Sequence, residues 1–266
     1  MADEEDSPPH GVDVTVANEA RVYDYYLGGK DNFEVDRAVA EATMAVVPDT
    51  PRLSQDNRDF TRRAAAFLAG EGIRQFLDLG SGLPTRQNIH EVAQTVDPEC
   101  RVVYVDNDPV VHAHGRALLA TNGHTVVVTA DLREPDEVLG HPRVSGMLDF
   151  SQPVAVFMAA VLHFQREGVA EIVGVYRDRI ADASWLVLTH AIGDGTPSET
   201  IAGVQEAYAH ARSPAVFRSR TEVEALFDGF DLVEPGFVNV SHWRPRSGQT
   251  GAPTSVQIWG GVGRKR

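Results

Sequence analysis

The sequence predicts an α/β fold in which helices flank a mostly parallel sheet. From Gly72 onward, short apolar runs rich in β-branched residues alternate with amphipathic segments, a pattern typical of parallel strands joined by helices. The last two strand-like runs are separated instead by a loop of Gly, Pro and Ser without a helix, and such a connection favours an antiparallel pair. We therefore expect five parallel strands followed by a C-terminal antiparallel hairpin.

The expected elements follow this order along the chain. Apolar runs predict parallel strands over residues 75–79, 101–106, 125–130, 154–158 and 185–190, and hairpin strands over 230–240 and 255–262. Helical spacing predicts the intervening helices over residues 88–95, 109–120, 167–181 and 198–211. The last helix begins beside Pro197, because proline is favoured in the first turn of a helix.

The N-terminal part of the chain is organised differently. Residues 1–13 are acidic and contain two prolines and a glycine, so they bury little and are expected to form a disordered lead-in. Over residues 14–72, apolar residues recur at intervals of three and four, which predicts helices interrupted at Gly28 and at Pro48. We interpret 14–72 as a helical cap within the same domain as residues 73–266, because one α/β domain of this length is common.

The charge of the chain argues against two classes of partner. It carries 24 basic and 38 acidic residues, a formal net charge of −14. This field repels phosphate backbones and anionic lipid headgroups. The sequence opens with acidic residues, unlike a secretory signal, and contains no apolar run of about 20 residues that could span a membrane. We expect a cytoplasmic protein that binds neither nucleic acid nor membranes.

Cysteine and histidine usage argues against a metal centre. Cys100 is the only cysteine, so neither an intrachain disulfide nor a cysteine-based metal cluster can form. His112 and His114 are two residues apart on an expected helix, and side chains at that spacing point to different faces. No metal is expected.

The clearest chemical motif is the segment Phe76-Leu77-Asp78-Leu79-Gly80-Ser81-Gly82, an apolar strand that leads into a tight glycine turn. Such a turn lets backbone N–H groups approach a ligand without obstruction from Cβ atoms, at the carboxyl edge where open α/β sheets bind ligands. Gly80, Ser81 and Gly82 are therefore candidate ligand contacts.

A dinucleotide site is the alternative interpretation of this turn, because NAD-dependent oxidoreductases use a similar one. Here Thr85 occupies the place of the third glycine in the dinucleotide pattern, and Pro84 lies in the turn. The Asp78 carboxylate would also repel a pyrophosphate, whereas it could hold an ammonium group. These features favour a different nucleoside cofactor.

Two further acids end the next two expected strands. Asp106 follows an apolar run 24 positions beyond Gly82, where a carboxylate can accept hydrogen bonds from ribose hydroxyls. Asp131 ends the strand after that and could accept from an adenine amine, while the backbone N–H of Leu132 could donate to a ring nitrogen. Three successive strands that end in acids at one edge predict a nucleoside site.

These motifs resemble those of class I S-adenosylmethionine-dependent methyltransferases. Residues 76–82 are similar to that family's glycine motif, Asp106 to its ribose acid, and Asp131-Leu132 to its adenine contact. The resemblance implies a Rossmann-like seven-stranded sheet and adds Asn107, beside Asp106, to the cofactor contacts. It also implies S-adenosyl-L-methionine as cofactor, with S-adenosyl-L-homocysteine as product.

A second resemblance covers nearly the whole chain. The segment Arg21-Val22-Tyr23-Asp24-Tyr25-Tyr26-Leu27-Gly28-Gly29-Lys30-Asp31-Asn32-Phe33, followed later by Asn57-Arg58-Asp59-Phe60, is similar to a bacterial family of such methyltransferases long catalogued as a domain of unknown function. This likeness implies an S-adenosylmethionine site and no particular acceptor.

Two residues of these segments are candidate cofactor contacts. Tyr26 could hold the methylsulfonium through its ring by a cation–π attraction, or it could anchor its helix to the core together with Tyr25. Arg58 could bind the methionine carboxylate in a bidentate manner, or it could form an ordinary surface ion pair.

One histidine is the candidate catalytic base. Methyl transfer from a sulfonium depends mainly on positioning, but a hydroxyl acceptor benefits from a base, for which histidine is the usual choice near neutral pH. His163 follows the fourth strand at its carboxyl end and is the first candidate; His190, which ends the fifth strand, is the second. Packing or capping roles stay open for both.

The sequence therefore favours a methyltransferase for a small apolar or aromatic acceptor. The alternatives are a cofactor-binding regulatory protein without turnover, since no strong catalytic constellation is visible, and an NAD-dependent oxidoreductase. A serine hydrolase is disfavoured because the Gly-x-Ser-x-Gly nucleophile motif is absent.

Overall fold

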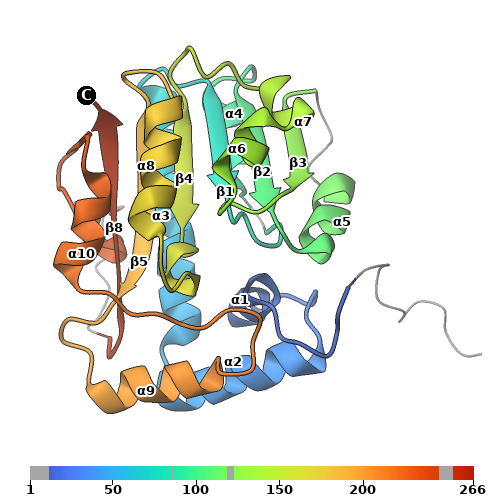
Figure 1. Ribbon diagram of the computed structural model, residues 1–266, viewed down its shortest axis with the longest axis vertical. Coiled ribbons are helices and arrows are strands. Elements are labelled where there is room, and N and C mark those ends of the chain that lie inside the picture. The colour runs from blue at the N-terminus through green and yellow to red at the C-terminus, as the bar shows by residue number, and fades with distance from the viewer. Residues whose placement is uncertain (1–11, 86, 119–122, 246–253) are drawn as a thin grey trace, which may run out of the picture.

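A single mixed sheet forms the centre of the fold (Figure 1). The structure is a computed structural model that describes residues 12–85, 87–118, 123–245 and 254–266, so most of the expected lead-in lies outside the described residues. The sheet order is β3-β2-β1-β4-β5-β8-β6, and β7 pairs with β8 outside this path. The strands are β1 (Gln75–Leu79), β2 (Arg101–Asp106), β3 (Thr125–Thr129), β4 (Ala155–Ala159), β5 (Trp185–Ile192), β6 (Phe230–Leu232), β7 (Val238–Asn239) and β8 (Gln257–Lys265).

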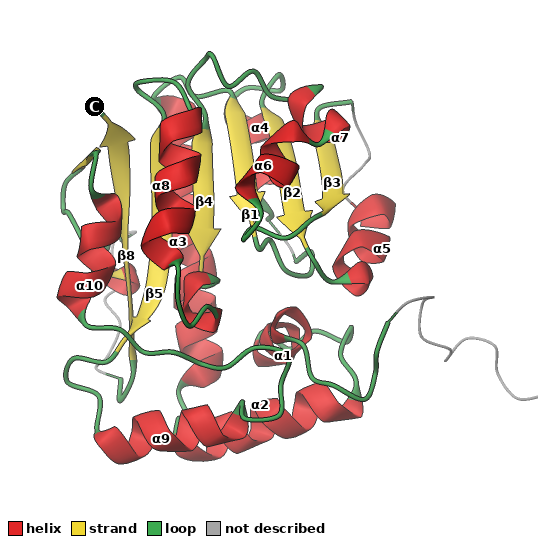
Figure 2. Cartoon of the chain, viewed as in Figure 1, coloured by secondary structure: helices red, strands yellow, loops and turns green. Residues whose placement is uncertain are grey.

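Helices join the parallel strands and lie on both sides of the sheet (Figure 2). The end of the helix expected over 109–120 lies outside the described residues. The α-helices are α1 (Glu19–Tyr26), α2 (Glu34–Val46), α3 (Thr50–Gly70), α4 (Ile89–Val96), α5 (Pro109–Leu118), α6 (Pro135–Gly140), α7 (Pro142–Ser145), α8 (Val169–Arg179), α9 (Ser198–Ala207) and α10 (Arg220–Glu224). Three 3₁₀ helices are η2 (Leu162–Phe164), η3 (Ala225–Phe227) and η4 (Val240–His242).

The parallel strands are predominantly apolar because both of their faces are buried. Successive side chains of a strand alternate between the two faces. Phe76 and Phe157 accordingly lie in one core cluster, with α3 and α4, whereas Leu77 and Met158 lie in the other, with α8. The predicted doubly wound α/β architecture with five parallel strands, β1 to β5, is confirmed.

The order of the strands creates a crevice at the end of β1. β1 pairs with β2 on one side and with β4 on the other, so the chain leaves β1 in one direction and later returns to its other side. In open α/β sheets, ligands bind where the strand order reverses in this way. The glycine turn that follows β1 lies at this point.

The C-terminal strands depart from the expected hairpin. The sequence predicts one strand over residues 230–240, but the structure has two, β6 and β7, and both pair antiparallel with β8. The break falls at Pro235, which has no N–H for a strand ladder, and at a turn closed by the Gly236 N–H, which donates to the Val233 carbonyl at 2.8 Å. β8 also pairs with β5, which joins these strands to the parallel part of the sheet. Since β6 and β7 are separate strands, the sheet has eight strands rather than seven.

Three helices form a layer across the carboxyl ends of the parallel strands. α1 packs on α2, and α2 packs on α9, which enters from the distant residues 198–207. Figure 1 shows these helices below the arrowheads of the strands. α3 differs from them, because its buried residues, which include Phe60 and Leu68, pack in the same core as β1 and β4. Within the described ranges, every helix is too short or too polar to span a bilayer.

Candidate functional site

The glycine turn after β1 is tied to the end of β2. The N–H groups of Gly80 and Ser81 both donate to the Val105 carbonyl, at 2.8 and 3.2 Å, and the Gly82 N–H donates to the Asp106 carboxylate at 2.9 Å. Gly80 has a φ of +71°, and a Cβ atom there would lie 2.3 Å from Cγ2 of Val161. Only glycine can therefore bring this turn so close to the segment after β4.

A cavity lies between this turn, the segment after β4, and helices α1 and α3. We call it the cofactor cavity, because it contains five of the residues expected to bind the cofactor. A smaller pocket adjoins it along residues 83–84 and 87–89. The cofactor cavity is lined by Glu19, Ala20, Tyr23, Asn57, Arg58, Thr61, Asp78, Gly80, Ser81, Gly82, Ala159, Ala160, Val161 and Phe164.

Asp78 presents a buried carboxylate to the cofactor cavity. The residue is only 6% exposed, and burial raises the pKa of Asp78 to about 7, with Arg58 acting to lower it and Asp106 to raise it. No hydrogen bond from the described residues contributes to lowering this pKa. A buried acid without donors is costly unless a ligand supplies them, so Asp78 is suited to a cationic group.

Arg58 reaches the same cavity from α3. Its Nη2 donates to the Leu83 carbonyl at 3.3 Å, and its guanidinium carbon lies 5.6 Å from the centroid of the Tyr23 ring. Nε is buried and has no hydrogen-bond partner among the described residues. The structure thus places Arg58 in the cavity rather than in a surface ion pair, with donors free for a carboxylate.

Asp106 lies beside the glycine turn, at the end of β2. Its two carboxylate oxygens accept from the N–H groups of Gly82, at 2.9 Å, and of Asp108, at 3.0 Å. Burial raises the pKa of Asp106 to about 6, although these two backbone hydrogen bonds lower it. An ionised carboxylate offers about four acceptor positions, so two stay available for hydroxyl groups. Asn107 lines a separate cavity with Arg21.

Asp131 and Leu132 are not brought to the cofactor cavity. The Asp131 carboxylate accepts from Nε of Arg133 at 2.9 and 3.0 Å; burial raises the pKa of Asp131, but the hydrogen bonds from Arg133 outweigh this and lower it. Leu132 is buried, and its carbonyl accepts from the Tyr176 hydroxyl at 3.1 Å. In this structure Asp131 is therefore occupied by a neighbour on its own loop.

A second cavity adjoins the first and differs from it in character. We call it the apolar cavity, because none of the described residues that line it is charged. It shares Tyr23, Ala160 and Phe164 with the cofactor cavity. It is lined by Tyr23, Tyr26, Thr43, Val47, Thr50, Leu53, Ser54, Ala160, His163, Phe164, Ala191, Val204, Tyr208, Ala215, Val216, Phe217, Val256 and Ile258.

The tyrosines of α1 divide between the two cavities. Tyr26 lies in the apolar cavity, where its hydroxyl and that of Tyr208 are 3.1 Å apart, and it does not line the cofactor cavity. Tyr23 borders both cavities. The sequence interpretation missed Tyr23 and also Glu19. The spacing could have identified them, because positions 19, 23 and 26 share one face of a helix.

His163 faces the apolar cavity from η2. Its Nδ1 is buried and has no hydrogen-bond partner in the described part of the chain. Burial lowers the pKa of His163 well below its usual value, and His190 and Arg218 lower it further. The ring is therefore neutral near pH 7, and it can accept a hydrogen bond from a bound hydroxyl group.

His190, the second candidate base, is committed to structural hydrogen bonds. It is fully buried, and its Nε2 lies 2.9 Å from the guanidinium of Arg218, which can only donate. Its Nδ1 consequently carries the proton and donates to the Ala191 carbonyl at 2.7 Å. Arg218 also donates to the carbonyls of Leu162, at 3.1 Å, and Gln165, at 2.6 Å. His190 and Arg218 thus hold the segment that carries His163.

A chain of hydrogen bonds connects the cap with the segment after β4. The Asn57 side chain donates to the Tyr23 hydroxyl at 2.9 Å and accepts from the Thr189 hydroxyl at 2.7 Å. The Thr189 hydroxyl in turn accepts from the N–H of Ala160 at 2.8 Å, a residue with a φ of +55°. Asn57, part of the motif that resembles the bacterial family, therefore fixes the wall shared by the two cavities.

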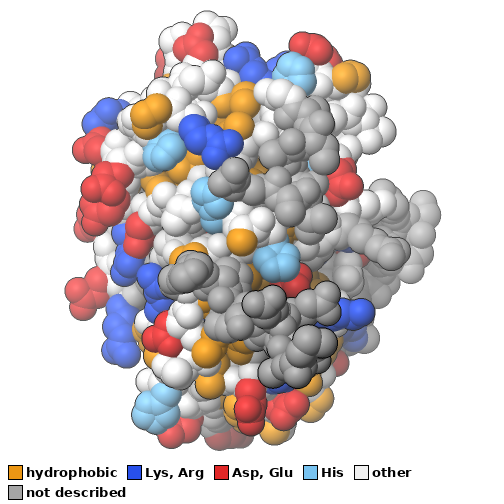
Figure 3. Space-filling model, turned by 90° about the vertical axis from the view of Figure 1, so that its right-hand side faces the viewer, with side chains coloured by type: hydrophobic (Ala, Val, Ile, Leu, Met, Phe, Trp, Pro, Cys, Tyr) orange, Lys and Arg blue, Asp and Glu red, His pale blue; other side chains and the backbone are white. Residues whose placement is uncertain are grey.

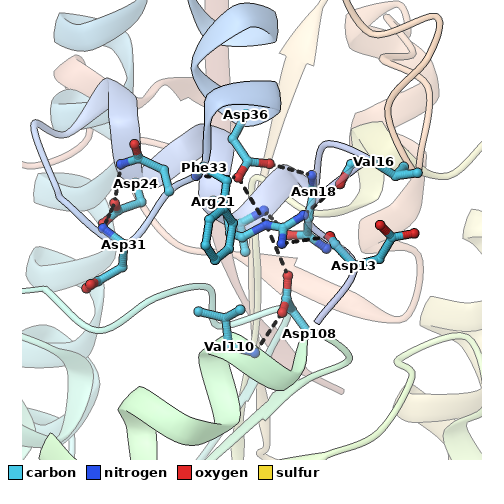
Figure 4. A network of polar contacts seen from close by, with 12 residues as sticks. Asp13, Val16, Asn18, Arg21, Asp24, Asp31, Phe33, Asp36, Asp108 and Val110 are labelled. Carbon is cyan, nitrogen blue, oxygen red and sulfur yellow. Dashed lines mark hydrogen bonds and ion pairs between the residues drawn. The ribbon is translucent and has the colours of Figure 1, made fainter. Parts of the chain in front are cut away.

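A buried ion-pair network fastens α1 to the end of β2 (Figure 4). Arg21 Nε lies 3.2 Å from the Asp36 carboxylate and 3.7 Å from that of Asp108, and the exposure of all three side chains is 3% or less. Arg21 also donates to the carbonyls of Asp13 and Val16, at 3.2 and 2.7 Å. The cap is thereby joined to the loop that follows Asp106.

The fold and the cavity define a class of protein. A doubly wound sheet with an antiparallel C-terminal end, and a glycine turn with two flanking acids at the reversal point, form a nucleoside-binding α/β domain of the class I methyltransferase type.

Comparison with known proteins places the chain in a family. The family model described as S-adenosyl methyltransferase matches residues 5–266, so the chain belongs to this family. It is 44% identical to a candidate methyltransferase from Thermobifida fusca YX, with a TM-score of 0.90, over 97% of this chain and 98% of the other. It is 38% identical to a DUF574 family protein from Streptomyces avermitilis MA-4680, with a TM-score of 0.91, over 96% and 99%. No curated protein matches the chain.

The protein is therefore an S-adenosylmethionine-dependent methyltransferase, and it requires a methyl acceptor. This confirms the predicted family, cofactor and Rossmann-like fold. It favours the predicted enzyme over both alternatives, the regulatory protein and the NAD-dependent oxidoreductase.

Proposed function

We propose that the protein methylates a small, uncharged acceptor bound in the apolar cavity, with the cofactor in the adjoining cofactor cavity. The observation that carries this proposal is the shared wall of Tyr23, Ala160 and Phe164, because transfer of a methyl group requires the two ligands to meet.

The residues of the cofactor cavity fit S-adenosyl-L-methionine. The glycine turn leaves the space that a Cβ atom would fill, and two buried polar atoms of the lining, Oε1 of Glu19 and Nε of Arg58, have no hydrogen-bond partner among the described residues. Asp78 would bind the ammonium group, Arg58 the carboxylate and Asp106 the ribose hydroxyls. When bound, the cofactor supplies a methyl group on a sulfonium that needs little activation.

The acceptor is expected to be uncharged because the apolar cavity offers no charged side chain, and burial of an unpaired charge is costly. The hydroxyls of Thr43 and Thr50 donate within their own segments, at 2.9 and 2.6 Å, and those of Tyr26 and Tyr208 meet each other. This lining suits an aromatic or aliphatic molecule with few polar groups.

His163 would receive the proton that an acceptor hydroxyl loses. The neutral ring faces the cavity, and formation of an imidazolium there would balance the positive charge lost from the sulfonium. Leu162 and Gln165, on either side, are held by Arg218, so the ring is presented by a fixed backbone.

The face of the molecule in Figure 3 gives no support for a nucleic-acid acceptor. On the face in Figure 3, described basic side chains are interspersed with acidic ones and do not gather into one patch. With a net charge of −14, the chain disfavours a polyanionic partner.

The test is to supply radiolabelled S-adenosylmethionine with two libraries, one of neutral phenols and aliphatic alcohols and one of charged acceptors including RNA. We expect label transfer only within the neutral library. Methylation of a charged acceptor at a higher rate would overturn the proposal.

A further inference from the structure

Glu19 is a charged residue of the cofactor cavity that the sequence motifs do not include. It is the first residue of α1 and lines the cavity together with Ala20 and Tyr23. Its Oε1 is buried and has no hydrogen-bond partner among the described residues. A buried carboxylate oxygen without a donor is destabilising unless a ligand compensates it, so its place in a ligand cavity points to a ligand contact.

The charges of the cavity can be matched with those of the cofactor. Its described lining contains two carboxylates, Glu19 and Asp78, and one guanidinium, Arg58. S-adenosylmethionine carries an ammonium, a sulfonium and a carboxylate. If Arg58 binds the carboxylate and Asp78 the ammonium, the remaining pair is Glu19 and the sulfonium. We propose that Glu19 is a cofactor-binding residue that distinguishes S-adenosylmethionine from S-adenosylhomocysteine through the charge on sulfur.

The surroundings of Glu19 support this role. Burial raises the pKa of Glu19, and hydrogen bonds with Ser213 and the charge of Arg212 only partly oppose it. Arg212 acts on Glu19 through its charge alone. Glu19 in turn helps to raise the pKa of Asp106, which indicates that both carboxylates act on the space beside the glycine turn.

This arrangement has a consequence for product release. Once the methyl group has left, the sulfur is a neutral thioether, and the cofactor has no net charge. Glu19 then has no positive charge on the ligand opposite its carboxylate. S-adenosylhomocysteine is consequently bound less tightly than S-adenosylmethionine, and the product is released more readily.

The inference rests on the proposed position of the cofactor, and isothermal titration at pH 8 can test the two separately. For Glu19→Gln we expect the Kd for S-adenosylmethionine to rise about tenfold, which corresponds to about 1.4 kcal/mol. The Kd for S-adenosylhomocysteine should change less than twofold. Glu206→Gln, on the exposed side of α9, is the matched control and should change neither value. Glu19→Asp, which keeps the charge, should retain part of the preference.

Equal weakening of both ligands by Glu19→Gln would overturn the inference, because it would indicate a contact with the ribose or with the cap. No change in either Kd would also overturn it. If Asp78→Asn likewise left both Kd values unchanged, the proposed position of the cofactor itself would be wrong.

Discussion

The two adjoining cavities share a wall but differ in the charge of the residues that line them. The cofactor cavity contains charged groups with unused hydrogen-bonding capacity, on Glu19, Arg58 and Asp78. The described lining of the apolar cavity has no charge. In the proposed function, the first binds a ligand with fixed charges, and the second would select its ligand by shape and by one ring nitrogen of His163. The difference explains why sequence motifs identify the cofactor and not the acceptor.

The largest effect is expected at the glycine turn of the cofactor cavity, where it meets the segment after β4. In Gly80→Ala, the new Cβ would lie 2.3 Å from Val161, on a residue whose positive φ disfavours side chains. Cofactor binding should fall below detection by isothermal titration. Gly174→Ala in α8, where the nearest atom to a new Cβ is 3.8 Å away, should bind normally. Normal binding by the Gly80 variant would show that the turn does not contact the cofactor.

The second largest effect is expected at His163, which is proposed to act in catalysis and not in cofactor binding. His163→Ala should lower kcat for a hydroxyl acceptor by about 10²-fold, the usual contribution of a general base. The Kd for S-adenosylmethionine should stay within twofold, because His163 lines only the apolar cavity. An unchanged kcat would assign His163 a packing role.

The pH dependence should also differ between the cavities. Since burial raises the pKa of Asp78 to about 7, and a cationic ligand requires its ionised form, affinity should fall as the pH falls through 7. The Kd for S-adenosylmethionine should be about tenfold higher at pH 6 than at pH 8. The pKa of His163 is held well below its usual value, so kcat at saturating cofactor should change little over this range. A pH-independent Kd would contradict the assignment of Asp78.

The smallest effect concerns stability. The folded protein keeps the Asp78 proton up to about pH 7, whereas the ordinary value is 3.8, so this group lowers stability as the pH rises between those values. Asp78→Asn removes the penalty and should raise the Tm of the free protein at pH 8 by a few degrees, or roughly 1–3 kcal/mol in unfolding free energy. A lower Tm would show that the carboxylate has a stabilising partner.

The strands and helices that have a clear local sequence pattern are the ones that the sequence predicts. β1 and β2 lie at the expected residues because both have a short apolar stretch with an acid at or next to its carboxyl end. The pattern does not predict α6, α7 and α10, each of six residues or fewer, because so short a segment shows little periodicity.

The candidate site, like the fold, is predicted only in part from the sequence. The glycine turn with Asp78 and Arg58 meets in one cavity as expected, whereas Asp131 and Tyr26 lie outside it. Asp131 is bound by Arg133, two residues further along the chain, and Tyr26 lies against Tyr208, which is distant in the sequence. The contact of Tyr26 cannot be seen in the sequence. The contact between Arg21 and Asp108 is equally invisible in the sequence, because it joins residues that only the fold brings together.

The most direct test of the two-cavity account is a crystal structure of the protein with S-adenosylhomocysteine. We expect the amino-acid part of the ligand between Asp78 and Arg58, its ribose at Asp106 and its sulfur facing the apolar cavity beside Phe164. A ligand bound away from the glycine turn, or with its sulfur directed away from that cavity, would contradict the account.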